Sequence, residues 1–522
     1  MIFNSIPFFL FIGIFLPLYF ALRGKARLWL CLIASYFFYG WWDARFLSLI
    51  VISTALDYFV GLQLDKTEEK SARKRLLILS MVVNLGFLAF FKYSNFFADS
   101  FADMLLSIGF EPNWHTLNII LPVGISFYTF QSMSYTIDVW KREIPTEKNF
   151  LRFATFIAFF PQLVAGPIVR ASEFLPQFQK DRDFDWNRIV SGSGQMLWGF
   201  FKKVAVADSL APFVDQCFAS PDTFSASHLF IGVIFYSFQI YCDFSGYSDI
   251  AIGLARMMGF DFPENFRTPY FSKDFSEFWT RWHITLSSWL RDYLYIPLGG
   301  NRSGSFGSVF FILVFMIFAI GVTQWWWLIP AFALILAGGA YYLRQGKREK
   351  AATFTMMNLM VTMLLGGLWH GSSYAFIFWG FLHGAYLVFQ RLLGPGFGRM
   401  LDTLRTPGWL KAGINTAIVF ALTAFAWIFF RSPDFATALS VIGGIANLET
   451  FTFGSVINKF MVLKGGLLIA ILLTVEVSDL RFKYGEVSLH KPVFRVATYT
   501  LLLWLIAFAG TFDSNAFIYF QF

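Results

Sequence analysis

Two histidines stand out in this chain because they occur within apolar and aromatic sequence. His370 ends an apolar run, Met356 to Trp369, and a second apolar run, Phe376 to Leu393, begins six residues after it. A titratable side chain at membrane depth is costly, so it is by default a candidate functional group. We therefore treat His370 as a candidate catalytic residue. The competing interpretation is a histidine that bonds a neighbouring helix.

The residues beside His370 are small. Three glycines flank it: Gly366, Gly367 and Gly371. Glycine leaves the backbone open to the close approach of a substrate or another helix. Ser372 and Ser373 are candidate N-caps for the helix that follows. The pattern predicts that His370 lies at a helix junction within the membrane.

His283 lies in the stretch 271–300, which is too polar to span a membrane and too aromatic for an ordinary loop. One face of a helical projection is apolar and carries Trp279, Trp282, Leu286, Trp289 and Tyr293. His283 and Ser287 share a neighbouring face with Thr280. This predicts an interfacial or re-entrant helix that presents His283 to a cavity, because irregular segments at membrane depth must be buried or line one. The alternative is an aromatic-belt helix whose histidine meets lipid headgroups.

Two carboxylates follow the apolar run 228–241, in the stretch Cys242 to Asp249. Such groups could be catalytic or bind a metal, but they more often bond arginines or backbone amides and fix a helix break. We favour the structural role for Asp243 and Asp249. His383, in the apolar run after His370, is interpreted as a packing residue or one that supports His370.

The composition excludes a soluble protein. The chain has 522 residues, of which 57% are hydrophobic, 20% aromatic and 14% charged. Apolar runs of about 17–22 residues recur, which predicts an all-α polytopic membrane protein. The three cysteines form no CxxC pair, so we expect neither a disulfide framework nor a metal site. The net charge of +8 reflects basic cytoplasmic loops, and we expect no nucleic-acid partner.

The N-terminal part carries an orientation signal. The candidate spans are 6–22, 28–43, 45–63, 75–91 and 117–140. Basic loops follow the first, third and fifth spans, whereas the loop 92–115 has one lysine and three acids. The positive-inside rule then places the N-terminus outside the cytoplasm. The first span lacks a basic n-region and a cleavage site, so we expect it to be retained.

The rest of the chain continues the apolar pattern. We expect a short span near 150–166, an amphipathic segment at 192–210 with Lys202 and Lys203 at its middle, and a helical hairpin formed by 306–322 and 325–343. The later apolar runs are 376–393, 413–430, 436–447, 467–477 and 493–510. No repeat, P-loop, GxSxG, HExxH or dinucleotide-binding fingerprint is evident.

Several motifs together resemble a known family. They are 121–131 (LPVGISFYTFQ), 160–168 (FPQLVAGPI), 243–249 (DFSGYSD), 265–301, 366–371 (GGLWHG) and 517–522 (FIYFQF). With them the chain resembles a membrane-bound O-acyltransferase of the alginate O-acetyltransferase branch over nearly its whole length. The resemblance implies a helical bundle around a central tunnel, with His370 matching the catalytic histidine and His283 near it. It also implies an acyl donor reached from the cytoplasm and an acceptor on the far side.

The chemistry of acyl transfer gives each histidine a role. Transfer from a thioester needs a base for the hydroxyl proton and a donor for the developing oxyanion. We expect His370 to be the general base and His283 to orient the acceptor or donate to the oxyanion. Weaker candidates for lining or bracing the tunnel are Asp243, Arg281, Trp282, Ser287, Arg291, Asp292, Tyr293, Asn301 and Trp369.

The resemblance also suggests donor, partners and location. We expect acetyl-CoA or an acyl carrier as the cytoplasmic donor, no permanently bound cofactor, membrane lipids and a separate extracytoplasmic transferase as partners, and the bacterial inner membrane as location. Basic residues that could attract the phosphates of CoA are Lys202, Lys203, Arg344, Lys347 and Arg348. The positive-inside rule explains the same charges equally well.

We expect one membrane domain, 1–522. Its parts are N-terminal helices (1–166), an amphipathic and re-entrant region with the first histidine (170–302), an inserted hairpin (303–350), catalytic-histidine helices (351–395) and C-terminal helices (396–522). The hairpin departs from the family pattern, but its even number of crossings lets both histidines keep their sides. Open alternatives are a peptidoglycan, cellulose or teichoic-acid-type acceptor, a proton-relaying transporter or channel, and a non-catalytic scaffold.

Overall fold

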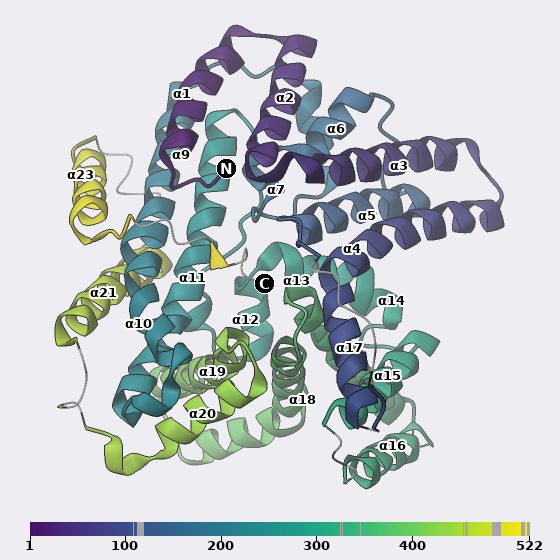
Figure 1. Cartoon of the computed structure of the whole chain (residues 1–522), viewed down its shortest axis with the longest axis vertical. Helices are drawn as coiled ribbons and strands as arrows, with labels where there is room; N and C mark the ends of the chain where they lie inside the picture. The colour runs from purple at the N-terminus through teal and green to yellow at the C-terminus, as the bar shows by residue number, and fades with distance from the viewer. Residues whose placement is uncertain are drawn as a thin grey trace. The chain divides into compact units, whose positions relative to one another are not determined.

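The computed structural model of the chain describes residues 1–107, 109–111, 119–323, 325, 327–344, 346–452, 454, 458–482, 492–512 and 517–518 (Figure 1). The regular elements of these residues are helices, which confirms the all-α fold class. Their contacts divide into two units. Unit 1 comprises 1–89, 121–267 and 439–522, and unit 2 comprises 90–120 and 268–438. The single membrane domain stays a prediction.

Many of the helices suit a bilayer. Within the described ranges, eight helical segments are long and apolar enough to cross a membrane by length and composition. Large apolar side chains stay exposed along them; on the first of these segments, Gly24–Lys66, Trp29, Ile33 and Phe37 are 54%, 61% and 52% exposed. Such a surface is unfavourable in water and expected against lipid. The chain is a multi-pass membrane protein.

Unit 1 begins with α1 (Ile6–Ala21), α2 (Gly24–Asp43), α3 (Leu47–Lys66) and the first part of α4 (Lys70–Ser107). It continues with α5 (Ile125–Lys141), α6 (Phe150–Ala158), α7 (Phe160–Leu163), α8 (Ala171–Phe174), α9 (Trp186–Phe200), α10 (Asp208–Ala219) and α11 (Ala226–Met257), with a π-helical segment η3 (Phe201–Ala207) between α9 and α10. At its C-terminal end are α21 (Lys459–Phe482) and α23 (Pro492–Ala509).

Helices α9 and α11 pack backbone to backbone. A methyl group built at Gly199 would lie 2.6 Å from the carbonyl oxygen of Gly246, and one at Gly192 would lie 2.5 Å from that of Gly253. Such contacts leave no room for a side chain. Two glycine pairs therefore hold these helices together, as small residues do in many membrane bundles.

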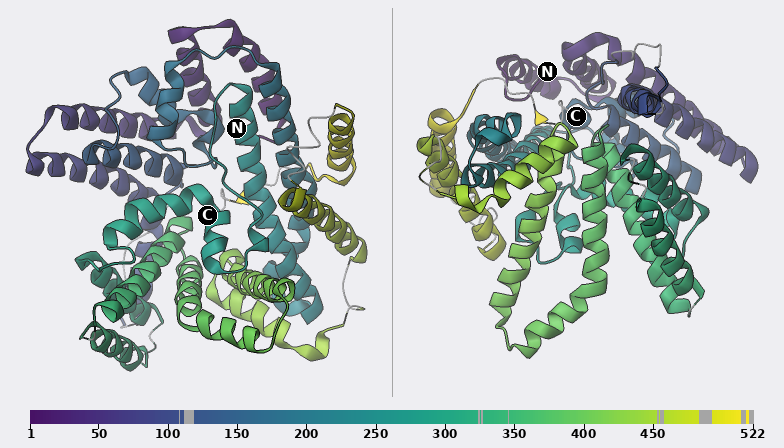
Figure 2. Two further views of the ribbon diagram at one scale, coloured as in Figure 1. Left: turned by 180° about the vertical axis from the view of Figure 1, so that it is seen from behind. Right: turned by 60° about the horizontal axis from the view of Figure 1, so that its bottom comes forward.

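Unit 2 contains the second part of α4, then α12 (Phe275–Arg281), α13 (Ile284–Leu290), the π-helical η6 (Arg291–Tyr295) and α14 (Ile296–Leu298). The helices α15 (Phe306–Thr323), α16 (Leu328–Arg344), α17 (Lys347–His370), α18 (Tyr374–Thr403) and α19 (Gly408–Arg431) follow. The right view of Figure 2 shows α18 and α19 as two long helices joined by a turn. The pair α15 and α16 is the predicted hairpin. Helix α20 (Phe435–Ala446) crosses the boundary between the units in sequence.

Three element boundaries differ from the sequence prediction. Helix α4 runs to Ser107, so the loop predicted from Lys92 is wrong over most of its length. An apolar-run criterion ends the span at the lysine, but the aromatic residues beyond it continue the helix. Helix α5 begins at Ile125, after the left-handed Gly124, and not near 117. The short span near 150–166 is divided into α6 and α7 at Phe159.

The helix break expected at Asp243–Asp249 is absent. Helix α11 continues through both carboxylates, from Ala226 to Met257. The carboxylate of Asp243 accepts a hydrogen bond of 2.8 Å from the backbone amide of Ile518, and Lys202 pairs with Asp249. Since side chains and a distant amide satisfy the carboxylates, the helix itself need not open.

Candidate active site

The backbone breaks at His283, so the continuous helical face drawn through this segment is wrong. Helix α12 ends at Arg281 and α13 begins at Ile284. His283 lies between them with φ of 43° and ψ of 53°, in the left-handed region. This conformation costs a non-glycine residue about 1–2 kcal/mol, and residues held in it cluster at functional sites. The side chain of His283 is fully buried.

The surrounding helices hold α12 in place. The side chain of Asp274 caps its start by accepting from the amide of Glu277 at 2.8 Å. Gln390 of α18 accepts from the amide of Phe275 at 2.7 Å through its side-chain oxygen. Because the first amides of a helix lack partners within the helix, these bonds fix where α12 starts and so where His283 lies.

His370 is the last residue of α17, as predicted for a helix junction. Gly371 follows as the C-cap, and Ser373 caps α18 by accepting from the amide of Phe376 at 3.4 Å. The side chain of His370 is 3% exposed. The junction places the imidazole at a helix end.

The two histidines lie together within unit 2. Their ring centroids are 6.3 Å apart, at an interplanar angle of 64°. The indole of Trp369 contacts both, with centroids 5.9 Å from His283 and 5.0 Å from His370. Trp379 and Phe430 cover His370, at 5.0 Å and 5.4 Å. Two imidazoles at this separation can both reach one substrate group by hydrogen bonds.

Helix α4 contributes two residues that the sequence interpretation missed. The ammonium of Lys92 donates hydrogen bonds to the backbone carbonyls of Trp369 and His370, the latter at 3.1 Å. The hydroxyl of Tyr93 donates to the carbonyl of Leu368 at 2.7 Å. The last carbonyls of a helix lack intrahelical partners, and a cation there also interacts favourably with the helix dipole. These side chains therefore hold the end of α17 that carries His370.

Asn358 is a third missed residue. It is fully buried on α17, and its amide donates to the carbonyls of Gly300 at 2.9 Å and Ser303 at 3.0 Å. Its side-chain oxygen accepts from the hydroxyl of Ser308 at 2.7 Å. The turn that follows α14 is thus tied to the helix of His370. The available signal was a polar residue within the apolar run 356–369.

The weaker candidates near His283 make local contacts of different kinds. Trp282 is buried and packs against Phe278 and Trp427, with ring centroids 5.7 Å and 5.0 Å away. Arg281 pairs with Glu277 at 2.7 Å. The backbone amide of Ser287 donates to the carbonyl of His283 at 2.9 Å, which links α13 to the break.

The candidates of η6 and the following turn lie nearer the surface. Arg291 is exposed and pairs with its neighbour Asp292 at 2.7 Å. Asn301 is exposed and accepts from the hydroxyl of Tyr295 at 2.7 Å. Tyr293 is half-buried and packs on Trp289, with centroids 5.1 Å apart. Arg291 and Asn301 thus differ from the two buried histidines.

Asp243 and the two lysines form a buried ionic cluster in unit 1. Lys203 pairs with Asp243 and, at 2.7 Å, with Asp208. Lys202 pairs with Asp249. Both lysines are only 5% exposed. They are therefore committed to internal pairs, and the interpretation of them as attractors for CoA phosphates is wrong.

His383 has the surroundings of a packing residue. It is fully buried on α18, and its ring lies 4.7 Å from Trp379, 5.2 Å from Trp279 and 5.8 Å from Phe278, measured between centroids. Among the described residues, neither of its ring nitrogens has a hydrogen-bond partner. The indole of Trp379 lies between the two histidines and contacts the rings of both His370 and His383.

The fold and site define a class of protein: a multi-pass helical membrane protein in which two segments bring two histidines together, an arrangement suited to acid–base chemistry. The chain belongs to the membrane-bound O-acyltransferase family. The sequence model of that family, described as "MBOAT, membrane-bound O-acyltransferase family", matches residues 36–332. This match includes His283 and ends before His370. The protein is thus a membrane O-acyltransferase.

Curated relatives extend the match. The chain is 41% identical to the probable alginate O-acetylase AlgI of Pseudomonas aeruginosa, over 84% of this chain and 73% of that protein. It is 34% identical to the peptidoglycan O-acetyltransferase of Helicobacter pylori, over 84% of this chain and 79% of that protein. The teichoic acid D-alanyltransferase of Streptococcus thermophilus is 27% identical over 54% of this chain and 60% of its own length.

Proposed function

We propose that this enzyme moves an acetyl group from cytoplasmic acetyl-CoA across the bacterial inner membrane for the O-acetylation of an exported, alginate-like polysaccharide. The observation that carries the proposal is the pair His283 and His370. Two segments that are distant in sequence bring both imidazoles into a buried site, with ring centroids 6.3 Å apart. An acyltransferase requires a base and an oxyanion donor at one place, and this pair supplies both.

The proposed reaction assigns His370 as general base. A basic ring nitrogen of His370 takes the proton of the acceptor hydroxyl. The hydroxyl oxygen attacks the carbonyl carbon of the acetyl thioester at the same time. A carbon–oxygen bond forms, and the carbonyl electron pair moves to oxygen. When this oxyanion collapses, the carbon–sulfur bond breaks and the CoA thiolate takes the proton from His370. The products are the acetyl ester and free CoA, and the histidine is regenerated.

His283 acts on the same reaction as a donor. A hydrogen bond from its ring stabilises the oxyanion or orients the acceptor hydroxyl. The left-handed backbone at this residue and the caps on α12 fix the direction of the side chain before the substrate binds. Preorganised donors in a site that excludes water stabilise developing charge better than water does. Trp369 lies against both rings and keeps their mutual orientation.

The proposed topology follows from the loop charges. The N-terminus lies outside the cytoplasm, and the alternate basic loops lie inside. Acetyl-CoA, or an acyl carrier, then approaches from the cytoplasm through a central tunnel. A separate extracytoplasmic transferase completes delivery to the polymer. The alginate O-acetylases among the relatives support an exported polysaccharide as the acceptor.

Peptidoglycan is the second candidate acceptor. The relative from Helicobacter pylori is named a peptidoglycan O-acetyltransferase and covers as much of this chain as the relative from Pseudomonas aeruginosa. Its identity is lower, 34% against 41%, which favours the alginate-like acceptor. Cellulose and teichoic-acid-type polymers remain alternatives in the same class.

The test is ester-linked acetyl on cell-surface polymers. Cells that lack the native gene receive the wild type, His370→Ala or His283→Ala, with membrane levels matched. Alkali-released acetate is then measured separately in the exopolysaccharide and the peptidoglycan fractions. Acetate in the exopolysaccharide with the wild type and its loss in His370→Ala support the proposal. Full acetylation in His370→Ala contradicts it and favours a scaffold, and acetate only in peptidoglycan changes the acceptor.

A further inference from the structure

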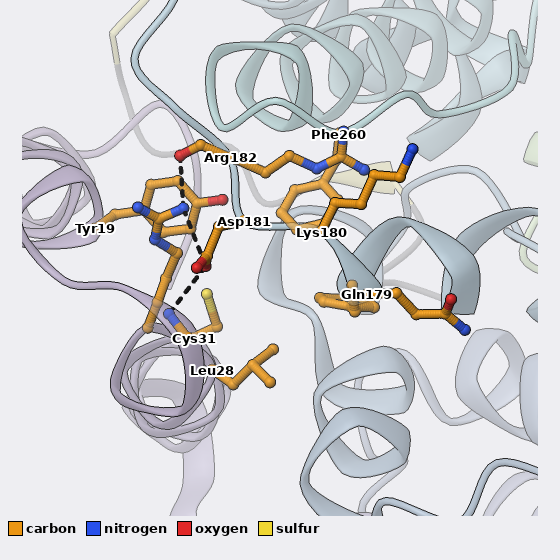
Figure 3. A pocket seen from close by; sticks show the side chains of 11 residues that line it. Tyr19, Leu28, Cys31, Gln179, Lys180, Asp181, Arg182 and Phe260 are labelled. Atoms are coloured by element: carbon orange, nitrogen blue, oxygen red, sulfur yellow. Dashed lines mark hydrogen bonds and ion pairs between the residues drawn. The ribbon is translucent and has the colours of Figure 1, made fainter.

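A polar cavity lies in unit 1 where the turn between α1 and α2 meets the segment after α8. Its volume is about 130 Å³. Tyr19, Cys31 and Phe260 provide its apolar and aromatic walls, and Asp181 and Arg182 line it with charged groups (Figure 3). Arg27 is a further charged lining residue. The cavity is lined by residues of unit 1 only, and neither His283 nor His370 is among them.

Arg27 is the fixed cation of the cavity. It is 6% exposed and donates to the carbonyl of Leu22 at 2.8 Å and that of Arg182 at 2.6 Å. Its guanidinium lies 4.8 Å from the ring centroid of Tyr19. Asp181 is the nearby anion, 3.9 Å from Arg27, and it also accepts from the amide of Gly24 at 2.9 Å. This carboxylate therefore balances Arg27 and caps the start of α2.

Lys180 and Arg182 are two further cations, and neither forms an ion pair with a carboxylate of the described residues. Both line the cavity. Arg182 donates to the carbonyl of Gln177 at 2.8 Å and lies 5.5 Å from the ring centroid of Phe260. Its Nε–H is buried and has no hydrogen-bond partner among the described residues. A buried donor on an uncompensated cation favours an acceptor that carries negative charge.

The surface beside the cavity is apolar. Phe20 contacts the lining residue Tyr19, and Phe184 contacts Phe20, with ring centroids 5.1 Å and 5.2 Å apart. Phe184 is 58% exposed, and Trp186 beside it is 64% exposed. A bilayer is the environment in which such side chains remain uncovered without cost. A ligand in the cavity therefore has an aromatic surface beside it, formed by Phe20, Phe184 and Trp186.

We propose that this cavity binds the phosphate headgroup of an anionic phospholipid. Lys180 and Arg182 contact the phosphate, and Arg27 adds a fixed positive charge behind it. The acyl chains lie against the exposed aromatic rings of Phe184 and Trp186. Basic pockets between membrane helices bind anionic headgroups through this combination of charge and apolar wall. A CoA phosphate offers the same charge but has no acyl chains for the apolar wall.

The test uses native mass spectrometry of the full-length protein in a neutral detergent. The protein is titrated with phosphatidylglycerol, with phosphatidylcholine and, in a third series, with CoA. The double variant Lys180→Gln/Arg182→Gln removes the two unbalanced cations. Arg23→Gln/Lys25→Gln is the matched control, because it removes two exposed cations from the same end of α2 that do not line the cavity.

We expect the wild type to prefer phosphatidylglycerol to phosphatidylcholine. At roughly a fivefold effect for each basic residue, Lys180→Gln/Arg182→Gln should weaken phosphatidylglycerol binding about 20- to 30-fold. The control should change it less than about twofold, because exposed charges are largely screened. Thermal unfolding of each protein shows whether it is folded, and the single variant Lys180→Gln, at an exposed position, should still give about a fivefold loss.

Three results would overturn the proposal. Equal weakening by both double variants would mean diffuse attraction to a basic surface. Equal affinity of the wild type for the two lipids would mean that binding does not depend on the charge of the lipid headgroup. Loss of CoA binding, but not of phosphatidylglycerol binding, in Lys180→Gln/Arg182→Gln would mean that the cavity binds the acyl donor and not a lipid.

Discussion

The side chain of Lys92 donates a hydrogen bond of 3.1 Å to the backbone carbonyl of His370. A cation on one membrane helix thus holds the end of another, and that end carries the proposed base. The contact involves the backbone of His370 and not its imidazole, so it fixes the position of the residue. Several measurements can separate such positioning from chemistry.

Lys92→Met should lower both stability and activity. The variant leaves the carbonyls of Trp369 and His370 without this donor, and an unsatisfied buried polar group costs about 1–3 kcal/mol. Thermal unfolding in detergent and acetyl transfer at matched membrane levels measure the two effects. Lys92→Arg should recover part of both, because a guanidinium keeps the donors. Lys25→Met, at an exposed position, is the control, and equal losses in Lys25→Met and Lys92→Met would contradict this role.

Asn358→Leu should loosen the turn after α14. The substitution removes two hydrogen bonds that Asn358 donates and one that it accepts. At about 1 kcal/mol for each, the free energy of unfolding should fall by roughly 3 kcal/mol. Thr362→Val on the same helix removes one hydrogen bond, from the Thr362 hydroxyl to the carbonyl of Asn358, and should cost about 1 kcal/mol. The same loss in both variants, measured by denaturant titration in mixed micelles, would argue against the three-bond arrangement.

Gly199→Ala should prevent the close packing of α9 on α11. The added methyl group would lie 2.6 Å from the carbonyl oxygen of Gly246, so the helices must separate. We expect a clear drop in the folded fraction, read by size-exclusion chromatography of the solubilised protein. Gly13→Ala on α1 is the matched control, because nothing lies within 4 Å of the added group. A normal elution profile for Gly199→Ala would refute the contact.

Lys203→Met should be among the most destabilising single changes in unit 1. It leaves Asp208 and Asp243 buried without this cation, and removal of one partner from a buried ion pair costs about 3–5 kcal/mol. Lys411→Met removes a more exposed pair with Asp402 and should cost at most about 1 kcal/mol. The two melting temperatures, compared in the same detergent, test the difference. Similar values would mean that the buried cluster contributes little.

Composition and hydropathy were sufficient for the class of fold, and they singled out the two histidines as candidates whose catalytic role stays a prediction. The apolar runs correspond to helices because a membrane span must satisfy its own backbone groups. His370 was placed at a helix end by its glycines and serines, which are local signals. The hairpin 306–343 was likewise visible as two apolar runs joined by a short turn.

Signals that depend on distant partners could not be found in this way. A helical projection assumes a continuous helix, so it could not show the left-handed backbone at His283. Lys92 ended an apolar run and was placed in a loop, because its partners are carbonyls 277 and 278 residues away. The carboxylate of Asp243 suggested a helix break in the sequence. In the structure it accepts a hydrogen bond from the amide of Ile518, 275 residues away, and the helix continues.

In the proposed reaction, His370 is the general base that takes the proton of the acceptor hydroxyl. The most direct measurement is transfer of radiolabelled acetyl from acetyl-CoA to the acceptor in membrane vesicles that carry the wild type, His370→Ala or His383→Phe at equal levels. His383→Phe keeps an aromatic ring in the packed cluster and should retain activity. General acid–base catalysis contributes about 10²–10⁴-fold, so His370→Ala should lose at least about 10²-fold. Transfer by His370→Ala at the rate of the wild type would exclude His370 as the base.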